Sequence, residues 1–520
     1  MRQVRNVLLV LLAFIISVPI GSLSALATNN QEISIYFNGS KIKTDAPPFI
    51  DPKVNITMVP LRVISENLEA KINWDQANKT VTITKDNRKL QLTAGKSEAI
   101  VDNEPISLDA SVQIINSRVM VPIRFVSEQL GLLVTWYQSA KTIKLETRDG
   151  NKQLRGTWIS TVYNLDWPSK AGVDQAAKQQ QDYINMLDQL QGMGINTVYV
   201  QVRASSDAFY ASKLVPWSKY LTGKQGVAPT YDPLSFMIDE THMRGMEFHA
   251  WFNPFRANTE VKTDTLASNH VVIEHPDWIV KSGTLLYINP GIPEARQHII
   301  DTIMEVVRNY QIDGVHLDDY FYPSNGDFDD NATYSQYQPQ KKLNKGDWRR
   351  DNINQFVQQL GKSIHQVKPK VKYGISPFGV WRNIADDPTG SDTKAGIPSY
   401  DYMYADVRTW IRNDWIDYIM PQLYWSMTFS AARYDKLVDW WTNEVRGTGV
   451  SLYIGHASYR IDKEGKDGWN TAQEIIDQLQ YNRQYPEIGG DVYFSARSLT
   501  SNLLGLSQLL RNYYGIKSSN

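Results

Sequence analysis

The sequence predicts an α/β protein, in which a (β/α)8 TIM barrel follows a smaller N-terminal α+β domain built from a tandem repeat. Three observations support this prediction. Strand-like apolar runs alternate with helical stretches from Gln153 onward, polar residues follow the ends of several of these runs, and one 26-residue segment recurs earlier in the chain. The length of 520 residues allows two to four domains at ~150 residues each.

Composition narrows the classes of partner and of chemistry. Hydrophobic residues make up 42% of the chain and charged residues 21%, which excludes a disordered protein. The 54 Lys and Arg against 55 Asp and Glu give a net charge of -1, so we expect no nucleic-acid partner. The absence of cysteine excludes disulfides and thiolate metal sites. The 15 Trp and 28 Tyr suit stacking on sugar rings, although large cores use them too.

The first 27 residues have the features of an export signal. Arg2 and Arg5 precede an apolar run over residues 7–20, and Ala25-Leu26-Ala27 matches an A-x-A cleavage pattern. The apolar run is shorter than the ~20 residues that a spanning helix needs, although an uncleaved anchor is the alternative. We expect residues 1–27 to be a signal peptide and the mature protein to keep no stable membrane anchor. Its expected location is secreted or associated with the cell wall.

An internal repeat occupies the region that we assign to a first domain, residues 30–147. Residues 58–83 and 120–145 are related by an offset of 62, and 11 of 26 positions are identical. Pro60 precedes a helical apolar stripe, and residues 72–74 and 81–83 alternate like two strands around a turn. Each copy is therefore predicted as a short helix with hairpins, and the two copies are predicted to share one core.

These repeats resemble the N-terminal domain of copper amine oxidases, which recurs in secreted proteins of Gram-positive bacteria. Residues 28–150 contain neither His nor Cys, so we expect no copper site there despite the name. We interpret the repeats as a module that targets the cell wall or a glycan. A spacer without a ligand is the alternative.

Eight strand-like runs and the helical segments between them predict a (β/α)8 barrel over residues 153–515. The predicted strands are residues 156–162, 197–203, 247–253, 314–319, 372–377, 418–423, 452–456 and 491–495. An open doubly wound sheet is the alternative, but the sequence contains neither G-x-G-x-x-G nor G-x-x-x-x-G-K-[ST]. Long segments over residues 254–292, 321–350 and 379–401 are expected to form the walls of an extended cleft.

Polar residues at the carboxyl ends of these strands predict a shared binding pocket, because barrel enzymes place their chemistry there. The substrate-binding candidates are Gln201, Arg203, His249, Asn253, His316, Tyr320, Trp381, Gln422 and Tyr424. Trp381, Trp410 and Trp425 are candidate stacking platforms for sugar rings, with core packing as the alternative. Hydrogen bonding without a ligand is the alternative for the polar residues. His249 and His316 could be metal ligands, with buried hydrogen-bonded positions as the alternative. No metal-binding spacing is present, so we expect neither a metal nor a cofactor.

The fourth strand carries the sharpest signal, the run DGVHLDDY from Asp313 to Tyr320. Strand alternation points His316 and Asp318 into the barrel, and Asp319 follows where strand becomes loop. Two neighbouring carboxyl groups suit glycoside hydrolysis, in which one protonates the leaving oxygen. The other carboxylate, or an acetamido oxygen of the substrate, stabilises or attacks the anomeric carbon. We predict Asp318 and Asp319 to be catalytic; a hard-cation site or a loop cap is the alternative.

Motifs at most strand ends carry a family resemblance. They are Arg155–Trp158, Gln201–Arg203, Trp251–Pro254, Asp313–Pro323, Asp347–Asn352, Ser376–Gly379 and Met420–Trp425. In these residues the chain from Arg155 to about Leu510 resembles the glycosyl hydrolase-like 10 family of bacterial barrel proteins. The resemblance implies a glycosidase that acts on peptidoglycan, since the family includes hydrolases of glycan strands stripped of their stem peptides.

The fourth-strand motif is also similar to the D-x-x-D-x-D-x-E signature of glycoside hydrolase family 18. Asp313 and Asp318 match its first and third acids, whereas His316 replaces the second acid and Tyr320 replaces the proton-donating glutamate. Tyrosine is a poor proton donor because its reference pKa is about 10. We therefore expect Asp319 to be the proton donor, and Asp318 to orient an acetamido group or to serve as the stabilising carboxylate.

The sequence thus predicts a secreted glycoside hydrolase whose substrate is a polysaccharide, the peptide-free glycan strand of peptidoglycan. One alternative is a non-catalytic glycan-binding or wall-scaffolding protein. Another is a glycosidase on chitin or a different N-acetylhexosamine polymer. The bond cleaved, hydrolysis against a lytic product, retention against inversion, and the oligomeric state stay open at this stage.

Overall fold

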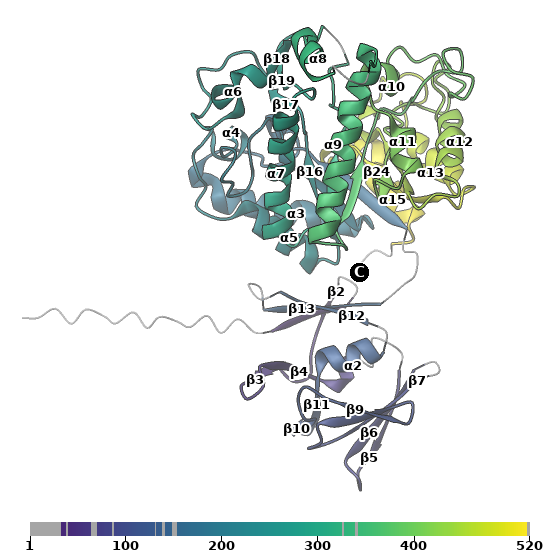
Figure 1. Cartoon of the computed structure of the whole chain (residues 1–520). Coiled ribbons are helices and arrows are strands. Elements are labelled where there is room, and N and C mark those ends of the chain that lie inside the picture. The colour runs from purple at the N-terminus through teal and green to yellow at the C-terminus, as the bar shows by residue number, and fades with distance from the viewer. Residues whose placement is uncertain are drawn as a thin grey trace, which may run out of the picture.

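The computed structural model divides the chain into a β-rich N-terminal unit and a barrel unit (Figure 1). It describes residues 33–37, 40–63, 70–85, 88–130, 132–137, 141–147, 153–324, 327–338 and 342–516. The signal peptide predicted at residues 1–27 lies outside this described part. Within it, no helix combines the length and the apolar character needed to cross a membrane.

In the described part of the N-terminal unit there are three sheets and the helix α2, and the helix predicted after Pro60 falls partly on residues 64–69, which lie outside the described part. The strand orders are β12-β13-β1-β2, β10-β11-β4-β3 and β5-β6-β7-β8-β9, with β1 and β13 parallel and the other pairs antiparallel. The elements are β1 (Ser34–Phe37), β2 (Ser40–Ile42), β3 (Phe49–Asp51), β4 (Ile56–Pro60), β5 (Lys71–Asp75), β6 (Thr80–Lys85), β7 (Arg88–Thr93), β8 (Glu98–Val101), β9 (Glu104–Ser107), β10 (Gln113–Ile115), β11 (Arg118–Pro122), α2 (Ile123–Gln129), β12 (Leu132–Tyr137) and β13 (Thr142–Thr147).

The two repeat copies pair with each other through equivalent residues. Strands β4 and β11 run antiparallel with Val59 opposite Val121 and Met58 opposite Pro122. Val59 faces its own counterpart Val121, and the pairs on either side, Met58 with Pro122 and Pro60 with Met120, are related by exchange of the copies, so a pseudo-twofold axis passes through this ladder. Both valines lie in one apolar cluster with residues of both copies, which confirms the shared core. The hairpin predicted within residues 72–83 is confirmed as β5–β6.

The barrel unit is a closed ring of eight parallel strands, as the sequence predicts. Around the ring these are β14 (Leu154–Ile159), β15 (Thr197–Arg203), β16 (Glu247–Phe252), β20 (Gly314–Leu317), β21 (Lys372–Ile375), β22 (Tyr418–Ile419), β23 (Ser451–His456) and β24 (Ile488–Tyr493). Strand β22 is shorter than expected because Pro421 has no N–H to donate to a ladder. Beyond it, Gln422 rejoins the sheet through single bridges to Phe378 and Gly455.

Helices cover the outside of the ring (Figure 1). They are α3 (Ala176–Gly192), α5 (Pro233–Met243), α7 (Pro293–Asn309), α9 (Lys345–Val367), α11 (Val407–Arg412), α12 (Tyr434–Val445), α13 (Gln473–Asn482) and α15 (Leu506–Tyr513), with the shorter α4 (Lys219–Thr222), α6 (Val271–Glu274), α8 (Asn331–Tyr337), α10 (Ser399–Tyr402) and α14 (Ala496–Thr500). Val315 and Leu317 of β20 pack into the cluster under these helices. This placement confirms the alternation predicted for the fourth strand.

The segment after the third strand is more ordered than the predicted loop over residues 254–292. It folds into a three-stranded antiparallel sheet of β17 (Arg256–Asn258), β19 (Leu285–Ile288) and β18 (Ile279–Ser282). Arg256 lies opposite Tyr287 in this sheet. This pairing holds β17 close to the end of β16, where Asn253 lies, and so fixes Arg256 near the site.

Candidate active site

Asp318 and Asp319 follow directly after β20, at the carboxyl end of the strand. Both are almost completely buried, with 4% and 5% of their surface exposed. The side-chain amide of Asn253 donates a hydrogen bond to Oδ2 of Asp318. The second oxygen, Oδ1, is buried and accepts no hydrogen bond of normal geometry from the described residues, although the Trp251 indole and the Tyr320 backbone N–H lie near enough to this carboxyl group to lower its pKa. A buried carboxylate oxygen without a donor indicates a position that a ligand or water fills.

Gln201 fixes the orientation of Asn253. The Gln201 side-chain N–H donates to Oδ1 of Asn253 at 2.5 Å. The side-chain oxygen of Gln201, Oε1, accepts hydrogen bonds from the backbone N–H of Thr161 at 3.0 Å and of Val162 at 2.9 Å. Since these bonds assign the oxygen of each amide, Asn253 is left to present its N–H to Asp318. Gln201 is therefore a positioning residue beneath the pocket, and this placement argues against direct substrate contact.

Arg203 also lies beneath the pocket. Its side chain is fully buried, and Nη1 donates to the backbone carbonyls of Asn253 at 2.8 Å and Pro254 at 3.0 Å. Burial lowers its pKa to about 10. Arg203 thus holds the segment that carries Asn253, which corrects its expected role as a substrate-binding residue.

The two carboxyl groups have different electrostatic surroundings. Burial raises the pKa of Asp318, while the Arg256 guanidinium opposes that increase. The pKa of Asp319 is raised more than that of Asp318, by burial and then by the neighbouring Asp318 charge. A hydrogen bond from Gln422 lowers the pKa of Asp319 and opposes part of this increase. Two carboxyl groups this close do not both ionise readily. The two carboxyl groups therefore titrate as a coupled pair, and the directions of the two pKa shifts favour the proton on Asp319.

Arg256 is a site residue that the sequence analysis missed. Its Nε donates to the carbonyl of Ala204 at 2.8 Å, and its guanidinium lies 5.3 Å from the centroid of the Tyr320 ring. Neighbouring Asp319, followed by burial, raises the pKa of Tyr320, so this phenol keeps its proton. The only signal in the sequence was a cation three residues beyond Asn253, in a segment predicted as loop.

Gln422 and Tyr424 reach the carboxyl pair from the sixth strand. The Gln422 side chain hydrogen-bonds Asp319, and its Nε2 donates to the Ser376 carbonyl at 3.1 Å. Burial and the charges of Tyr459 and Asp319 raise the pKa of Tyr424, which brings this phenol into the same electrostatic environment. The structure thus gathers Asn253, Tyr320, Gln422 and Tyr424 around the two carboxyl groups.

His249 and His316 lie deeper, in the closed interior of the barrel. Both are fully buried. The Trp158 indole N–H donates to Nε2 of His316 at 3.1 Å, and the Tyr418 hydroxyl bridges Nδ1 of His316 and Nδ1 of His249, at 3.1 Å from each. Nε2 of His249 faces Glu247 at 3.2 Å. These partners occupy all four ring nitrogens, so the expected substrate contacts of both histidines are not supported.

A single direction of donation satisfies this interior chain. Because Trp158 is a donor only, His316 accepts at Nε2 and donates from Nδ1 to Tyr418. The Tyr418 hydroxyl then donates to His249, which donates to the Glu247 carboxylate. Burial lowers the pKa of His316 well below its usual value, in agreement with a neutral ring. Among the described residues, no group of three or more His, Asp or Glu is arranged to hold a metal ion.

Trp381 does not offer a free face to a sugar. Its ring stacks on Trp440 at 5.7 Å and lies 4.2 Å below the Arg408 guanidinium. Only 5% of its surface is exposed. The expected substrate-binding role of Trp381 is therefore corrected to packing against helices α11 and α12.

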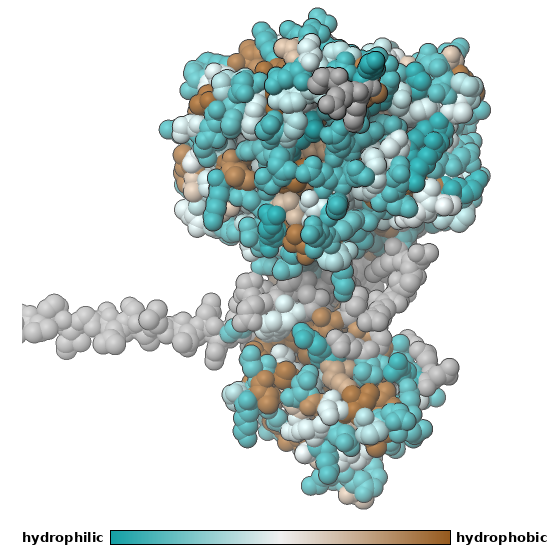
Figure 2. Space-filling model, viewed as in Figure 1, coloured by the Kyte–Doolittle hydropathy of each residue, from teal (hydrophilic) through white to brown (hydrophobic). Residues whose placement is uncertain are grey.

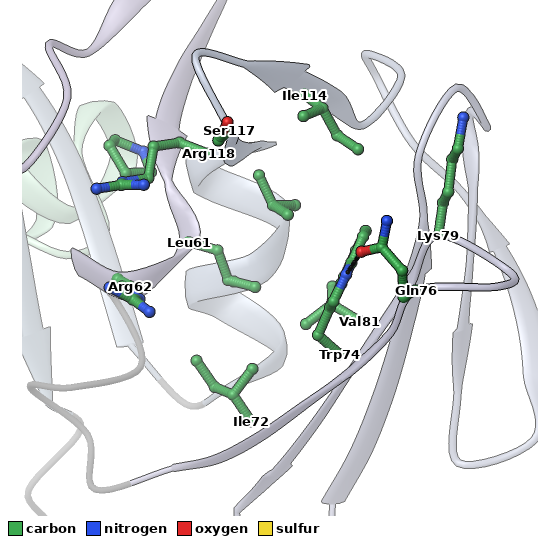
Figure 3. A pocket seen from close by; sticks show the side chains of 12 residues that line it. Leu61, Arg62, Ile72, Trp74, Gln76, Lys79, Val81, Ile114, Ser117 and Arg118 are labelled. Atoms are coloured by element: carbon green, nitrogen blue, oxygen red, sulfur yellow. Dashed lines mark hydrogen bonds between the residues drawn. The ribbon is translucent and has the colours of Figure 1, made fainter.

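A separate groove of about 570 Å³ opens on the N-terminal unit (Figure 3). Ile72 and Trp74 of β5 line one side, and Leu61 and Ile114 lie across from them. Trp74 is 37% exposed, and its indole N–H donates to Oε1 of Gln76 at 2.7 Å. Figure 2 shows hydrophobic patches on the surface of this unit. The groove thus combines an oriented, exposed aromatic ring with apolar walls.

Many residues that line the groove stand at positions where the two repeat copies are identical. Five of its lining residues occupy positions that are identical between the copies: Pro60, Arg62, Trp74, Gln76 and Lys79. The lining also includes Arg118, which pairs with Asp45. No Asp or Glu is among the described residues that line it. Asp45 neutralises Arg118, so the positive charge of the lining comes from Arg62 and Lys79 and suits an anionic ligand.

Comparison with known proteins matches the chain to two families. A model of the family described as glycosyl hydrolase-like 10 matches residues 153–471, and a model of the copper amine oxidase N-terminal domain matches residues 36–145. Glycosyl hydrolase YngK of Bacillus subtilis (strain 168) is 51% identical over 364 residues, covering 69% of this chain and 71% of that protein. Glycosyl hydrolase DigH of Escherichia coli (strain K12) is 42% identical over 370 residues, covering 67% and 84%.

Among solved structures, the glycoside hydrolase domain of PgaB (BpsB) from Bordetella bronchiseptica is similar to 70% of this chain and to all of that domain. The sequence identity is 13% and the TM-score is 0.44.

Proposed function

Since this chain belongs to the glycosyl hydrolase-like 10 family and is a glycoside hydrolase, we propose that it cleaves peptide-free glycan strands of bacterial peptidoglycan. Asp319 is the proton donor and Asp318 is its charged partner. The observation that carries this assignment is the buried pair itself, in which burial and the Asp318 charge keep the proton on Asp319. Asn253 and Arg256 favour the charged form of Asp318.

The proposed reaction follows from these protonation states. Asp319 gives its proton to the glycosidic oxygen as the bond between that oxygen and the anomeric carbon breaks. Asp318 either faces the positive charge that develops on the sugar ring or accepts the N–H of an acetamido group whose carbonyl oxygen attacks the anomeric carbon. Water then adds to the anomeric carbon and returns a proton to Asp319, so the enzyme is regenerated.

One feature of the site supports an N-acetylated sugar as the substrate. The unpaired Oδ1 of Asp318 is an acceptor suited to an amide N–H, and a buried acceptor left without a donor costs ~1–3 kcal/mol. The family resemblance then favours peptidoglycan strands over chitin. Chitin and other N-acetylhexosamine polymers are the alternative substrates.

Mass spectrometry of reaction products tests the proposed substrate. The purified full chain is incubated with peptide-free glycan strands, intact peptidoglycan and chitin oligomers. We expect a ladder of disaccharide steps from the peptide-free strands, and no ladder with Asp319→Asn. Cleavage of chitin oligomers as fast as of peptide-free strands would contradict the proposed substrate. No cleavage of any polymer would favour a glycan-binding protein.

For the N-terminal unit we propose targeting to wall glycan through the groove that contains Trp74. The exposed ring and the cationic lining without carboxylates support this role. Sedimentation of the full chain with insoluble peptidoglycan is expected to fall for Trp74→Ala and to persist for Trp74→Phe. Ile100→Ala is the control, since Ile100 is 39% exposed on the same unit outside the groove. Equal sedimentation of all variants would favour a spacer.

We further propose that residues 1–27 direct export and are then removed. The support is the sequence pattern that ends at Ala27. N-terminal sequencing of protein recovered from the medium or wall fraction of a Gram-positive host is expected to begin at Thr28. Uncleaved protein in the cytosolic fraction would contradict this proposal.

A further inference from the structure

A second, smaller pocket of about 280 Å³ lies beside the mouth of the barrel. Two segments build it, one following β22 and one following β23, so both leave strands at their carboxyl ends. Trp425 and Phe429 come from the first segment, and Tyr459 and Trp469 come from the second. Nη1 of Arg460 donates to the carbonyl of Tyr424 at 2.7 Å, and this bond ties the two segments together.

The pocket lies a short distance along the chain from a residue that bonds the carboxyl pair. Gln422 hydrogen-bonds Asp319, and Trp425 is only three residues further along the chain. Its Cα thus lies within ~11 Å of that of Gln422, because an extended chain spans at most ~3.6 Å per residue. Between them, the Tyr424 ring contacts Tyr459 edge-on, with 6.0 Å between centroids. The Tyr424 ring therefore lies between the residue that bonds Asp319 and the Tyr459 wall of the pocket.

The walls of the pocket have the chemistry of a sugar-binding site. Tyr459 is 50% exposed, and no hydrogen bond of its hydroxyl is formed with the described residues, so its ring is the part available for contact. Lys466 and Asp467 lie at the rim and offer a donor and an acceptor. A pyranose has an apolar C–H face and polar edges, so it matches apolar walls with a polar rim.

We propose that this pocket is a subsite for one pyranose ring of the glycan chain, adjacent to the bond that is cleaved. Tyr459 and Trp425 supply the stacking surfaces. This subsite rests on the proposed glycosidase function and extends it, because it makes the enzyme favour chains long enough to reach the pocket. Substrates that stop short of it lose the stacking contact and bind more weakly.

Binding of oligosaccharides of increasing length tests the subsite. Calorimetry uses the full chain carrying Asp319→Asn, so that peptide-free glycan oligomers stay intact, alone and combined with Tyr459→Ala, Tyr459→Phe or Trp425→Ala. We expect Tyr459→Ala and Trp425→Ala each to weaken binding of the longest oligomer by about tenfold and to flatten the length dependence. Tyr459→Phe is expected to retain the affinity, since it keeps the ring.

Thermal unfolding of each variant controls for loss of fold. Unchanged affinity of folded Tyr459→Ala for the longest oligomer would overturn the subsite while leaving the glycosidase function in place. Absence of binding by Asp319→Asn to oligomers of every length, together with no cleavage by the unmodified chain, would overturn both.

Discussion

The side-chain amide of Asn253 donates a hydrogen bond to Asp318, and Gln201 fixes the direction of that bond. Oδ2 of Asp318 is therefore held as an acceptor, and this bond favours the ionised form of the carboxyl group. Its charge in turn raises the pKa of Asp319. Gln201, Asn253 and Asp318 thus act in sequence to favour the protonated form of Asp319, which supplies the proton to the leaving group.

Removal of the Asn253 amide is expected to impair catalysis without unfolding the protein. A hydrogen bond to a charged group is worth ~1.5–3 kcal/mol, which corresponds to about a 10- to 100-fold loss of turnover. Steady-state kinetics of Asn253→Ala measures this loss. Asn258→Ala is the control, because Asn258 bonds only the backbone of its own segment; an equal loss in both variants would contradict the specific role of Asn253.

The activity is expected to depend on pH with two limbs. Activity requires Asp318 ionised and Asp319 protonated. Burial raises the pKa of Asp318 to about 6, so kcat/KM rises as the pH increases through about 6. The pKa of Asp319 is higher, so kcat/KM falls again as that group loses its proton. A profile of kcat/KM against pH that declines steadily from pH 5 would contradict this order of ionisation.

Substitution of Arg256 is expected to move the first of these limbs. The Arg256 guanidinium lowers the pKa of Asp318 against the effect of burial. In Arg256→Met that pKa rises, and the ascending limb shifts to higher pH. Arg446→Met is the control, since exposed Arg446 bonds Glu487 outside the site. An ascending limb that stays in place in Arg256→Met would show that this cation does not act on Asp318.

Asp319→Asn is expected to raise stability at neutral pH while it removes activity. A folded-state pKa above the unfolded value of ~3.9 makes stability fall as pH rises from about 4 towards the folded pKa. Asn carries no charge and escapes this penalty, so the Tm at pH 7 rises by about 2 °C or more. Calorimetric unfolding is expected to show a smaller difference near pH 4. A variant that is less stable at pH 7 would contradict the buried-acid account.

Gly374 is expected to be essential for the packing of the barrel interior. A Cβ at this position would collide with the Tyr418 ring, which carries the bond between the two buried histidines. Gly374→Ala should therefore cost ~1–3 kcal/mol or more in the free energy of unfolding. Denaturant titration measures this, with Gly396→Ala as the control because a Cβ there meets no atom within 4 Å. Equal stabilities would contradict the collision.

The barrel and its carboxyl pair could be predicted because the local alternation of apolar and polar residues indicates the strands and the side each residue faces. The alternation of Val315, His316, Leu317 and Asp318 alone assigns a helix-facing and an interior side to the fourth strand. The depth of each interior residue is a different matter. His316 precedes Asp318 by two residues, which places it ~6.6 Å deeper along the strand. That spacing separates the closed interior, where His316 lies, from the mouth, where Asp318 lies.

The positions of Arg203 and Arg256 depend on contacts between distant segments. Arg203 lies under the mouth because its donors meet the carbonyls of Asn253 and Pro254, 50 and 51 residues away. Arg256 returns to the site because β17 pairs with β19, which sets Arg256 opposite Tyr287. Neither contact leaves a periodic pattern in the sequence. The position of Arg203 at a strand end therefore predicted a substrate contact, and no pattern in the sequence pointed to Arg256.

The most direct test of the central claim compares leaving groups in two variants. A glycoside with a natural sugar leaving group needs a proton donor, whereas an activated aryl glycoside leaves as a stable phenolate and does not. We predict that Asp319→Asn loses at least about 100-fold in kcat on the natural substrate and far less on the aryl glycoside, whereas Asp318→Asn loses activity on both. An equal loss on the two substrates for Asp319→Asn would contradict its assignment as the proton donor.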